Sequence, residues 1–485
     1  MSRRGDRAGT RYPDGPAEVA GAPVPVDERG VPVPPVSGVG SALTPEPPHA
    51  GRALRAFING VEVGLLQEQG GLWRFSYAPG WLASPQGFAL SPWLPLQAGP
   101  LVDGASERPV QWYFDNLLPE EGQRTLMARD AGVGVEDAFG LLQYYGAESA
   151  GSLTLLPPDV AGEPPGRLRP LSHGSLEGRI GRLPRVALTQ DALKRMSLAG
   201  AQHKLALVLE GDALFEPQDG TPSTHVLKPD HPDADYPHSV INEFFVMRLA
   251  ARLGLPVPPV HRLYVPSPVY LVERFDRVRG AAGWQRRHVV DACQLLGLDR
   301  SFKYSQGSIE RLAELAALCR SPLLARTQLF SWLLFNVLVG NGDAHLKNLS
   351  FLVSDEGIQL APFYDLLSVA AYETPAFDQQ GWPAHTQLAW PILGVRHFSG
   401  ITHALLLEAA HKLGLPPATA ARLLDDLVRQ IVPQADELLN VISRENEVIL
   451  HQQPTLANRL AGEMRCLRVI RHTILPEMLA RVRAG

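Results

Sequence analysis

The sequence predicts an α+β fold with a small β-rich N-terminal lobe followed by a large helical C-terminal lobe. Short apolar and β-branched runs, separated by Gly, Asn and Asp turn residues, recur between residues 54 and 275 and predict strands. The apolar run 329–339 is too long for a typical strand and predicts a buried helix. From residue 417 to 484, helical periodicity and propensity predict a long helical end to the chain.

Composition indicates an ordinary globular protein and excludes several functional classes. The 485 residues suffice for two or three domains, and the net charge of −5 gives no general attraction to nucleic acid or anionic membranes. The cysteines Cys293, Cys319 and Cys466 form no CxxC pair, so we expect neither a disulfide framework nor a structural zinc site. No apolar segment follows the basic start, and no apolar run reaches the roughly 18 residues of a membrane span. We therefore expect a cytoplasmic protein with no membrane partner.

Changes in composition along the chain predict five segments. The first 50 residues hold 17 Gly or Pro and a single aromatic residue, which predicts a disordered tail. Abundant Pro, Gly and Arg after residue 156 predict a linker between two lobes. The expected segments are the tail 1–50, a β-rich N-terminal subdomain 51–156, the linker 157–190, a second β-rich core 191–280 and a helical lobe 281–485.

The N-terminal subdomain begins with a hairpin signal. Asn59-Gly60 separates the alternating runs 54–58 and 61–65, and this dipeptide strongly favours a two-residue β-hairpin turn. The other elements expected here are a strand at 72–77, helical structure from 111 to about 145, and a short strand at 153–156.

After the expected linker, predicted strands surround one helix. The residues 210–212, Glu-Gly-Asp, are typical of a tight turn within a hairpin spanning 204–215. The amphipathic run 241–253 predicts a helix that ends at Gly254 and Pro256. The remaining expected elements are strands at 224–228 and 269–275.

The loop 340–348, Gly-Asn-Gly-Asp-Ala-His-Leu-Lys-Asn, carries the strongest chemical signal. Asp343 and Asn348 are five positions apart, the spacing of the catalytic base and the metal-ligating Asn in a protein-kinase catalytic loop. The carboxylate would face the acceptor hydroxyl while the Asn side chain turns toward Mg²⁺ at the phosphates. A polar loop that follows a helix explains the two residues better when they are considered alone.

A predicted hairpin follows this loop. The runs 349–353 and 358–361 flank the turn 354–357, and the hairpin leads to Asp365. In protein kinases, a segment of this kind leads from the catalytic loop to the second Mg²⁺-binding Asp, which favours Asp365 as a metal ligand. Capping of a following helix is the alternative role for Asp365.

Lys228 closes the strand 224–228 and could bind the α- and β-phosphates of ATP. Glu243, near the start of the next helix, is the candidate carboxylate that would hold this lysine. The alternative is an exposed lysine at a strand end, where an ion pair would add little to stability.

Two loops complete the candidate nucleotide site. The segment 197–204 is rich in small residues whose backbone N–H groups could approach phosphate, with Lys204 adding positive charge, although a tight turn is an equal alternative. The residues 273–276, Glu-Arg-Phe-Asp, end a strand and could form a hinge that binds adenine through its backbone. No HExxH or GxSxG motif is present, which disfavours zinc-protease and serine-hydrolase chemistry.

Together these motifs resemble the HipA family, the serine/threonine kinase toxins of bacterial type II toxin–antitoxin systems. The resemblance runs from about Leu54 to the C-terminus, and it implies a two-lobed protein-kinase-like fold with an ATP-binding core at 191–280. The motifs that carry it are Phe75–Pro79, Ser91–Leu96, Phe114–Pro119, Ser197–Gln202, Val272–Asp276 and Gly342–Asn348.

The resemblance also implies roles for individual residues. Asp343 matches the catalytic base, Asn348 and Asp365 match the Mg²⁺ ligands, and Ser197 matches a serine whose autophosphorylation switches the kinase off. His203 stands where the family commonly has an acidic residue. The residues implied to surround ATP are Ala199, Gly200, Ala201, Gln202, His203, Lys204, Lys228, Glu273, Arg274, Phe275, His345, Leu346, Lys347, Asn348, Tyr364 and Asp365.

The resemblance implies partners as well. These are a HipB-like helix-turn-helix antitoxin, DNA reached only indirectly through that antitoxin, and a protein substrate, for which the family's targets are aminoacyl-tRNA synthetases. The expected activity is Mg²⁺- and ATP-dependent phosphorylation of serine or threonine in a protein. A small-molecule phosphotransferase and a kinase-fold binding module that acts mainly with an antitoxin in repression are the alternatives.

Overall fold

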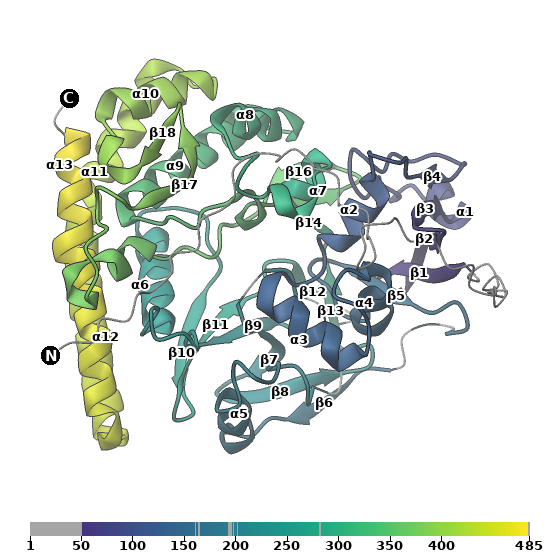
Figure 1. Ribbon diagram of the computed structural model, residues 1–485, viewed down its shortest axis with the longest axis horizontal. Helices are drawn as coiled ribbons and strands as arrows, with labels where there is room; N and C mark the ends of the chain where they lie inside the picture. Colours follow the sequence, from purple (N-terminus) through teal and green to yellow (C-terminus); the bar gives the residue numbers. More distant parts are fainter. Residues whose placement is uncertain are drawn as a thin grey trace, which may run out of the picture. The chain divides into compact units, whose positions relative to one another are not determined.

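The computed structural model describes residues 51–483 with the exception of 161, 163–164, 193–195, 197, 201 and 281–282. The tail expected at 1–50 lies outside the described residues, as do Ser197 and Ala201 of the candidate phosphate loop. Within the described ranges, two sheets in the first part of the chain are followed by a mainly helical part (Figure 1). This order confirms the predicted α+β, kinase-like arrangement.

The first sheet has five strands in the order β4-β3-β2-β1-β5. Asn59 and Gly60 join β1 to β2 with φ angles of 49° and 81°, as a type I′ turn requires. The predicted hairpin and the predicted strands at 72–77 and 153–156 are therefore confirmed. The strands are β1 (Arg52–Ile58), β2 (Val61–Gln69), β3 (Leu72–Tyr77), β4 (Leu101–Val102) and β5 (Leu153–Leu156).

Helices pack on this first sheet. Helical structure expected from 111 to 145 is divided into three helices, because Pro119 follows the first and Gly132 ends the second with a left-handed φ of 68°. Phe75 of the sheet and Phe114 of a helix have ring centroids 5.5 Å apart in the shared core. The helices are α1 (Pro79–Ala83), α2 (Pro109–Asp115), α3 (Glu121–Ala131) and α4 (Ala138–Tyr145).

The second sheet has six strands, each antiparallel to its neighbours, in the order β10-β11-β9-β7-β8-β6. The predicted hairpin 204–215 forms β7 and β8, with Gly211 at a φ of 60° in the turn. The other two predicted strands agree with β9 and β11 to within two residues. The strands are β6 (Arg167–Pro170), β7 (Leu205–Glu210), β8 (Ala213–Gln218), β9 (His225–Pro229), β10 (Val260–Tyr264) and β11 (Pro268–Glu273).

The segment 157–190 is not the simple linker that its composition predicted. It contains β6, which is the edge strand of the second sheet, and α5 (His173–Ile180). Leu176 of α5 is fully buried in the same hydrophobic cluster as Leu205 and Leu227 of the sheet. Proline is tolerated on an edge strand, because one row of N–H groups there needs no partner. High Pro, Gly and Arg content therefore did not exclude regular structure.

The helical part is organised around α9 (Pro322–Val339), which contains the run predicted to be a core helix. Of the described helices, α9 alone is long and apolar enough to cross a membrane, but 61% of it is buried within the fold, as in a core helix. The end of the chain is helical as predicted. The other helices are α7 (Ala292–Leu296), α8 (Ile309–Leu318), α10 (His403–Lys412), α11 (Pro417–Gln452), α12 (Ala457–Val469) and α13 (Leu475–Arg483).

Helix α6 (Ser239–Arg252) joins the second sheet to the helical part. It contacts β10 and β11 of the sheet as well as α11 and α12 (Figure 1). Of its 14 residues, 11 are buried, which is more than the amphipathic pattern predicted. A helix enclosed on most sides is a rigid support for any side chain that it presents to a site.

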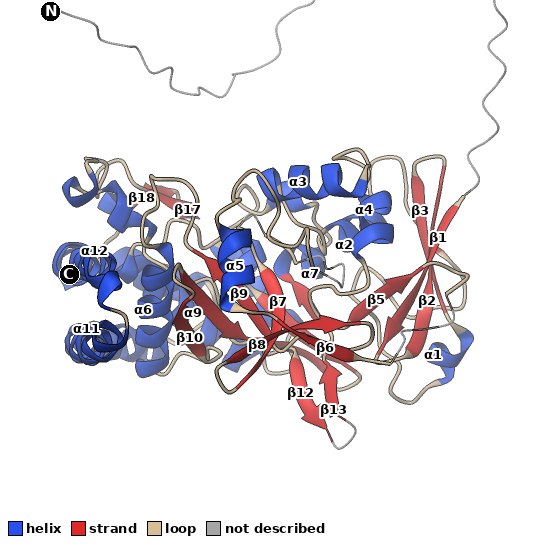
Figure 2. Ribbon diagram, turned by 90° about the horizontal axis from the view of Figure 1, so that it is seen from below, coloured by secondary structure: helices blue, strands red, loops and turns tan. Residues whose placement is uncertain are grey.

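Three smaller strand groups complete the fold. Figure 2 shows the hairpin of β12 (Arg277–Gly280) and β13 (Gly283–Arg286) extending away from the second sheet. The hairpin predicted after the loop 340–348 is confirmed as β15 (Ser350–Ser354) and β16 (Gly357–Leu360), and β14 (Val289–Asp291) pairs with β15. In the helical part, β17 (Gln387–Ile392) pairs with β18 (Val395–His397).

Candidate functional site

A cavity of about 150 Å³ lies between the second sheet and the β14–β15 region. Val226 of β9 and Val272 of β11 give it apolar walls. Phe275 and Tyr364 also line it, and their rings stack with centroids 5.7 Å apart and an interplanar angle of 30°. These flat apolar surfaces suit a planar base.

The charged part of this cavity is built on Lys228. Its Nζ donates to Glu243 Oε1 at 2.8 Å and Oε2 at 3.1 Å, and it also contacts Asp365 Oδ1. Lys228 comes from β9, Glu243 from the enclosed helix α6, and Asp365 from the segment after β16. The predicted pairing of Lys228 with Glu243 is confirmed, and both side chains are buried rather than exposed.

Opposite charges maintain the ionised forms of this cluster. Burial raises the pKa of Asp365, but Lys228 and Lys204 outweigh burial and hold that pKa well below its usual range. Burial lowers the pKa of Lys228, but Asp365 and Glu243 outweigh burial and raise it above its usual value. Asp365 is therefore a carboxylate at neutral pH and can serve as a ligand for a hard cation.

Asp365 does not cap a helix. Its φ of 55° is left-handed, and the helical turn that follows, Val369–Glu373, begins after Ser368. The Asp365 carbonyl accepts from Asn341 Nδ2 at 3.4 Å, which ties this segment to the loop 340–348. The alternative role of Asp365 as a helix cap is therefore wrong.

The loop 340–348 is held by its own side chains. Asn348 Nδ2 donates to the Asp343 carbonyl at 2.8 Å, and the Asp343 N–H donates to Asn341 Oδ1 at 3.1 Å. A Cβ on Gly342 would lie 2.8 Å from the carbonyl oxygen of Gln387, so only glycine fits here. The carboxylate of Asp343 accepts a hydrogen bond of 2.5 Å from the Tyr304 hydroxyl.

A second cavity, of about 370 Å³, contains Asp343 and Asn348. Lys204 and Asp365 line both cavities, so the base-binding region and the loop 340–348 meet at these two charges. Lys204 Nζ donates to the Ala199 carbonyl at 2.6 Å, and burial lowers the pKa of this lysine. Gly200 has a φ of 103°, which favours glycine, and a Cβ there would lie 2.6 Å from Lys204 Nζ and displace the end of that side chain.

Most of the described candidate residues meet at these two cavities. The first cavity is lined by Ala199, Lys204, Lys228, Glu273, Arg274, Phe275, Tyr364 and Asp365. The second is lined by Gly200, Gln202, Lys204, Asp343, His345, Asn348 and Asp365. Ser197 and Ala201 lie outside the described residues.

Three candidates, His203, Leu346 and Lys347, line neither cavity. Leu346 is 1% exposed and belongs to the hydrophobic core. The Lys347 Nζ donates to Asp291 Oδ2 at 2.6 Å and to Asn116 Oδ1 at 2.7 Å, so it points into the N-terminal part. The expectation that the Lys347 side chain contacts ATP is therefore not supported by its position.

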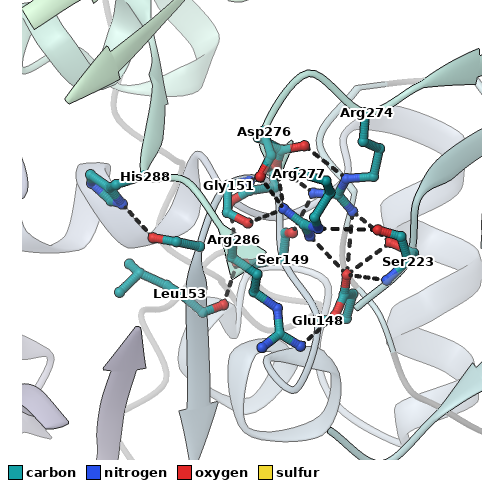
Figure 3. A network of polar contacts seen from close by, with 12 residues as sticks. Glu148, Ser149, Gly151, Leu153, Ser223, Arg274, Asp276, Arg277, Arg286 and His288 are labelled. Atoms are coloured by element: carbon teal, nitrogen blue, oxygen red, sulfur yellow. Dashed lines mark hydrogen bonds and ion pairs between the residues drawn. The ribbon is translucent and has the colours of Figure 1, made fainter. Parts of the chain in front are cut away.

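The hinge 273–276 rests on a buried network that the sequence did not suggest. Figure 3 shows Arg274 and Arg277 between two carboxylates, Asp276 and Glu148, and Glu148 follows α4. Arg274 Nη2 donates to Asp276 Oδ2 at 2.6 Å, and Arg277 Nη2 donates to Glu148 Oε1 at 2.9 Å. The Arg274 guanidinium thus links the hinge to Ser149, Ser223 and Glu148. More than 120 residues separate Glu148 from Arg274 in the chain, so no local pattern could have linked them.

Comparison with protein families finds two matching family models. Residues 54–156 match the HipA N-terminal domain, and residues 196–435 match the HipA-like C-terminal domain. The two matches together include both cavities.

Named relatives are similar over most of their length. A Sinorhizobium fredii protein named as a kinase, Y4mE, is 40% identical over 66% of this chain and 78% of its own. The serine/threonine-protein kinase toxin HipA of Shewanella oneidensis is 37% identical over 63% of this chain and 71% of its own. The Shewanella HipA solved with HipB and operator DNA matches in structure with a TM-score of 0.66 and 30% identity, covering 88% of this chain and 99% of that one.

Proposed function

The chain belongs to the HipA family of serine/threonine protein kinases, and from that premise we propose that it transfers the γ-phosphoryl group of ATP to a serine or threonine of a protein. The observation that carries this proposal is the buried cluster of Lys228, Glu243 and Asp365 beside the loop that holds Asp343. A kinase site needs a lysine for the phosphates, carboxylate and amide ligands for Mg²⁺, and a base near the acceptor.

The available donor atoms fit Mg²⁺. Asp365 offers an ionised carboxylate, and Asn348 uses Nδ2 to bind the Asp343 carbonyl, which leaves Oδ1 for a cation. Both residues line the second cavity. Oxygen ligands of this kind suit Mg²⁺, which would neutralise negative charge on the phosphate oxygens when bound.

The other residues position the reactants. The adenine would lie between Val226, Val272 and the stacked Phe275–Tyr364 pair. Lys228, held by Glu243, would bind the phosphates, and Asp343 would orient the acceptor hydroxyl and take its proton. The proposed path of the phosphoryl group runs from the first cavity into the second.

We propose partners of the same kind as those named for the relative. Shewanella HipA was solved with HipB and operator DNA, and this likeness supports a small helix-turn-helix antitoxin, with DNA reached only through it. A protein such as an aminoacyl-tRNA synthetase is the proposed target, Ser197 the proposed site of self-phosphorylation, and the cytoplasm the proposed compartment.

The test is intact-mass spectrometry of purified protein after incubation with Mg-ATP, beside the Asp343→Asn variant. We expect the parent to gain one phosphate at Ser197 and the variant to gain none while retaining nucleotide binding. Asn keeps the size of the side chain but cannot accept the hydroxyl proton. Equal phosphorylation of both proteins would contradict the assignment of Asp343.

If the parent protein gains no phosphate in this experiment, the two alternative functions are tested next. Transfer of label from ATP to a small-molecule extract would then indicate a small-molecule phosphotransferase. Failure to bind nucleotide, combined with binding to an antitoxin, would indicate a binding module.

A further inference from the structure

His225, His261 and Glu273 gather on one face of the second sheet. They come from the adjacent strands β9, β10 and β11, with β11 in the middle. His225 is the direct cross-strand partner of Glu273, and His261 pairs with Leu271, two residues before Glu273. Because alternate residues of a strand point to the same face, the three side chains project together.

The spacing of these side chains is close to that of a metal site. One potential ligand atom from each residue lies within 4.8 Å of the others, and His261 Nε2 is 3.4 Å from Glu273 Oε1. Zinc bonds of about 2.0–2.1 Å in tetrahedral geometry place neighbouring ligand atoms about 3.3 Å apart. The two ligand atoms that lie farthest apart must therefore approach each other by at most about 1.5 Å. The side chains of His261 and Glu273, 43% and 46% exposed, are free to make this movement.

One ring nitrogen of His225 is oriented by a neighbouring side chain, and the other is available to a metal ion. Its Nδ1 is 2.9 Å from Thr224 Oγ1, and Nε2 makes no hydrogen bond to any residue that the structure describes. Metal-binding histidines are neutral, and a second polar group commonly orients the ring through its other nitrogen.

We propose that His225, His261 and Glu273 bind Zn²⁺, with water completing a tetrahedral site. Two imidazoles and one carboxylate favour zinc over the harder ions Mg²⁺ and Ca²⁺, which prefer oxygen ligands. The site is distinct from the proposed Mg²⁺ ligands Asn348 and Asp365.

The position of the site suggests a structural role, which departs from the expectation of no structural zinc site because that expectation considered cysteine spacing alone and these ligands are His and Glu. A bound ion would cross-link three strands at the point where β11 leads into the hinge 274–276. Val226 and Val272, the chain neighbours of His225 and Glu273, line the first cavity. Zinc would therefore stabilise the wall of the nucleotide cavity from its outer side, and it should raise the melting temperature of the folded protein.

The test uses the full chain, stripped of metal with a chelator and titrated with Zn²⁺ against a chromophoric zinc indicator, without nucleotide or Mg²⁺. The parent is compared with His261→Ala and Glu273→Gln, whose half-exposed side chains can change without disturbing the core, and with His225→Ala. The control is His451→Ala, an exposed histidine near the end of α11. Circular dichroism checks that every variant is folded.

We expect at least a 10-fold loss of affinity for one Zn²⁺ equivalent in the three site variants and parental affinity in His451→Ala. Zinc should raise the melting temperature of the parent but not of His261→Ala. Equal zinc stoichiometry and affinity in the parent, His261→Ala and Glu273→Gln would overturn the proposal and leave an ordinary His261–Glu273 ion pair. Both readouts are independent of catalysis, so this proposal and the proposed kinase activity can fail separately.

Discussion

At the scale of single residues, Tyr304 is the partner of the candidate base. Its hydroxyl donates to Asp343 Oδ1 at 2.5 Å, and its ring lies edge-on to His345 with centroids 4.9 Å apart. Partial burial raises the pKa of Tyr304 above its usual value, and Asp343 adds to this effect, so the phenol is a donor at neutral pH. We assign Tyr304 as a positioning residue, because it holds one carboxylate oxygen and leaves the other for the acceptor.

The Tyr304→Phe variant removes this hydrogen bond and retains the ring. A hydrogen bond to a charged group is worth about 1.5–3 kcal/mol, so we expect kcat to fall roughly 10-fold or more. The KM for ATP should not change, because Tyr304 does not line the first cavity, where we propose that the nucleotide binds. Steady-state kinetics measures both constants. Tyr236→Phe, in the same second cavity, is the matched control, and a kcat for Tyr304→Phe equal to that of the control would refute the assignment.

At the scale of elements, the hinge between the two parts of the chain depends on a carboxylate from the N-terminal part. Glu148 accepts from Arg277 at 2.9 Å, from Ser223 Oγ at 2.9 Å and from Arg286 at 3.2 Å, and it is fully enclosed (Figure 3). Arg274, also in the network, is a hinge residue that lines the nucleotide cavity. The geometry of the hinge thus depends partly on Glu148, a residue of the N-terminal part that lies between α4 and β5.

The Glu148→Gln variant keeps the shape of the side chain and removes its charge. Breaking a buried ion pair by removing one partner costs about 3–5 kcal/mol, so we expect a loss of this size in the free energy of unfolding and weaker ATP binding. Urea denaturation and nucleotide titration provide the two measurements. Glu62→Gln is the control, because its pair with Arg55 is exposed to solvent and should contribute little to stability. Parental stability in Glu148→Gln would show that the network is not needed.

At the scale of the whole molecule, His288 connects the first sheet's helices to the strands near the hinge. Its Nε2 lies 3.1 Å from both the Leu90 carbonyl and the Tyr113 hydroxyl, and its Nδ1 is 2.9 Å from Ser152 Oγ. Since a carbonyl can only accept, Nε2 carries the proton and Nδ1 accepts from Ser152. Burial lowers the pKa of His288 to about 4, so the folded protein holds this ring in its neutral form.

This pKa predicts an acid-dependent contribution to stability. The ordinary histidine pKa of about 6.5 applies in the unfolded chain, so between pH 6.5 and 4 the unfolded state binds more protons. The stabilisation from neutral His288 is present above pH 6.5 and decreases by about 1.4 kcal/mol per pH unit as the pH falls. In urea denaturation, we expect the stability difference between the parent and His288→Gln to shrink between pH 6.5 and pH 4.5. A constant difference between the parent and His288→Gln would contradict the low pKa of His288.

Local sequence was sufficient for the parts of the fold that local interactions determine. The Asn59-Gly60 hairpin, the core helix α9 and the hairpin β15–β16 were predicted, because turn conformation and hydrophobic period are properties of neighbouring residues. The same holds for the spacing of Asp343 and Asn348, which lie in one loop, and for the pairing of a strand lysine with the next helix. These features identified the fold class and the centre of the candidate site.

Tertiary structure decided the contacts between residues that are distant in the chain. Three hydrogen bonds join segments that are 39 or more residues apart: Arg277 to Glu148, Tyr304 to Asp343, and Lys347 to Asn116. The hydrophobic period of a sequence does not predict such pairs. The linker prediction failed for the same reason, because β6 is a strand only where the edge of β8 is present to pair with it. His225, His261 and Glu273 likewise become neighbours only through strand order. The sequence determined the elements that local turns and hydrophobic period specify, together with the spacing of Asp343 and Asn348, whereas burial and long-range pairing determined which charges meet.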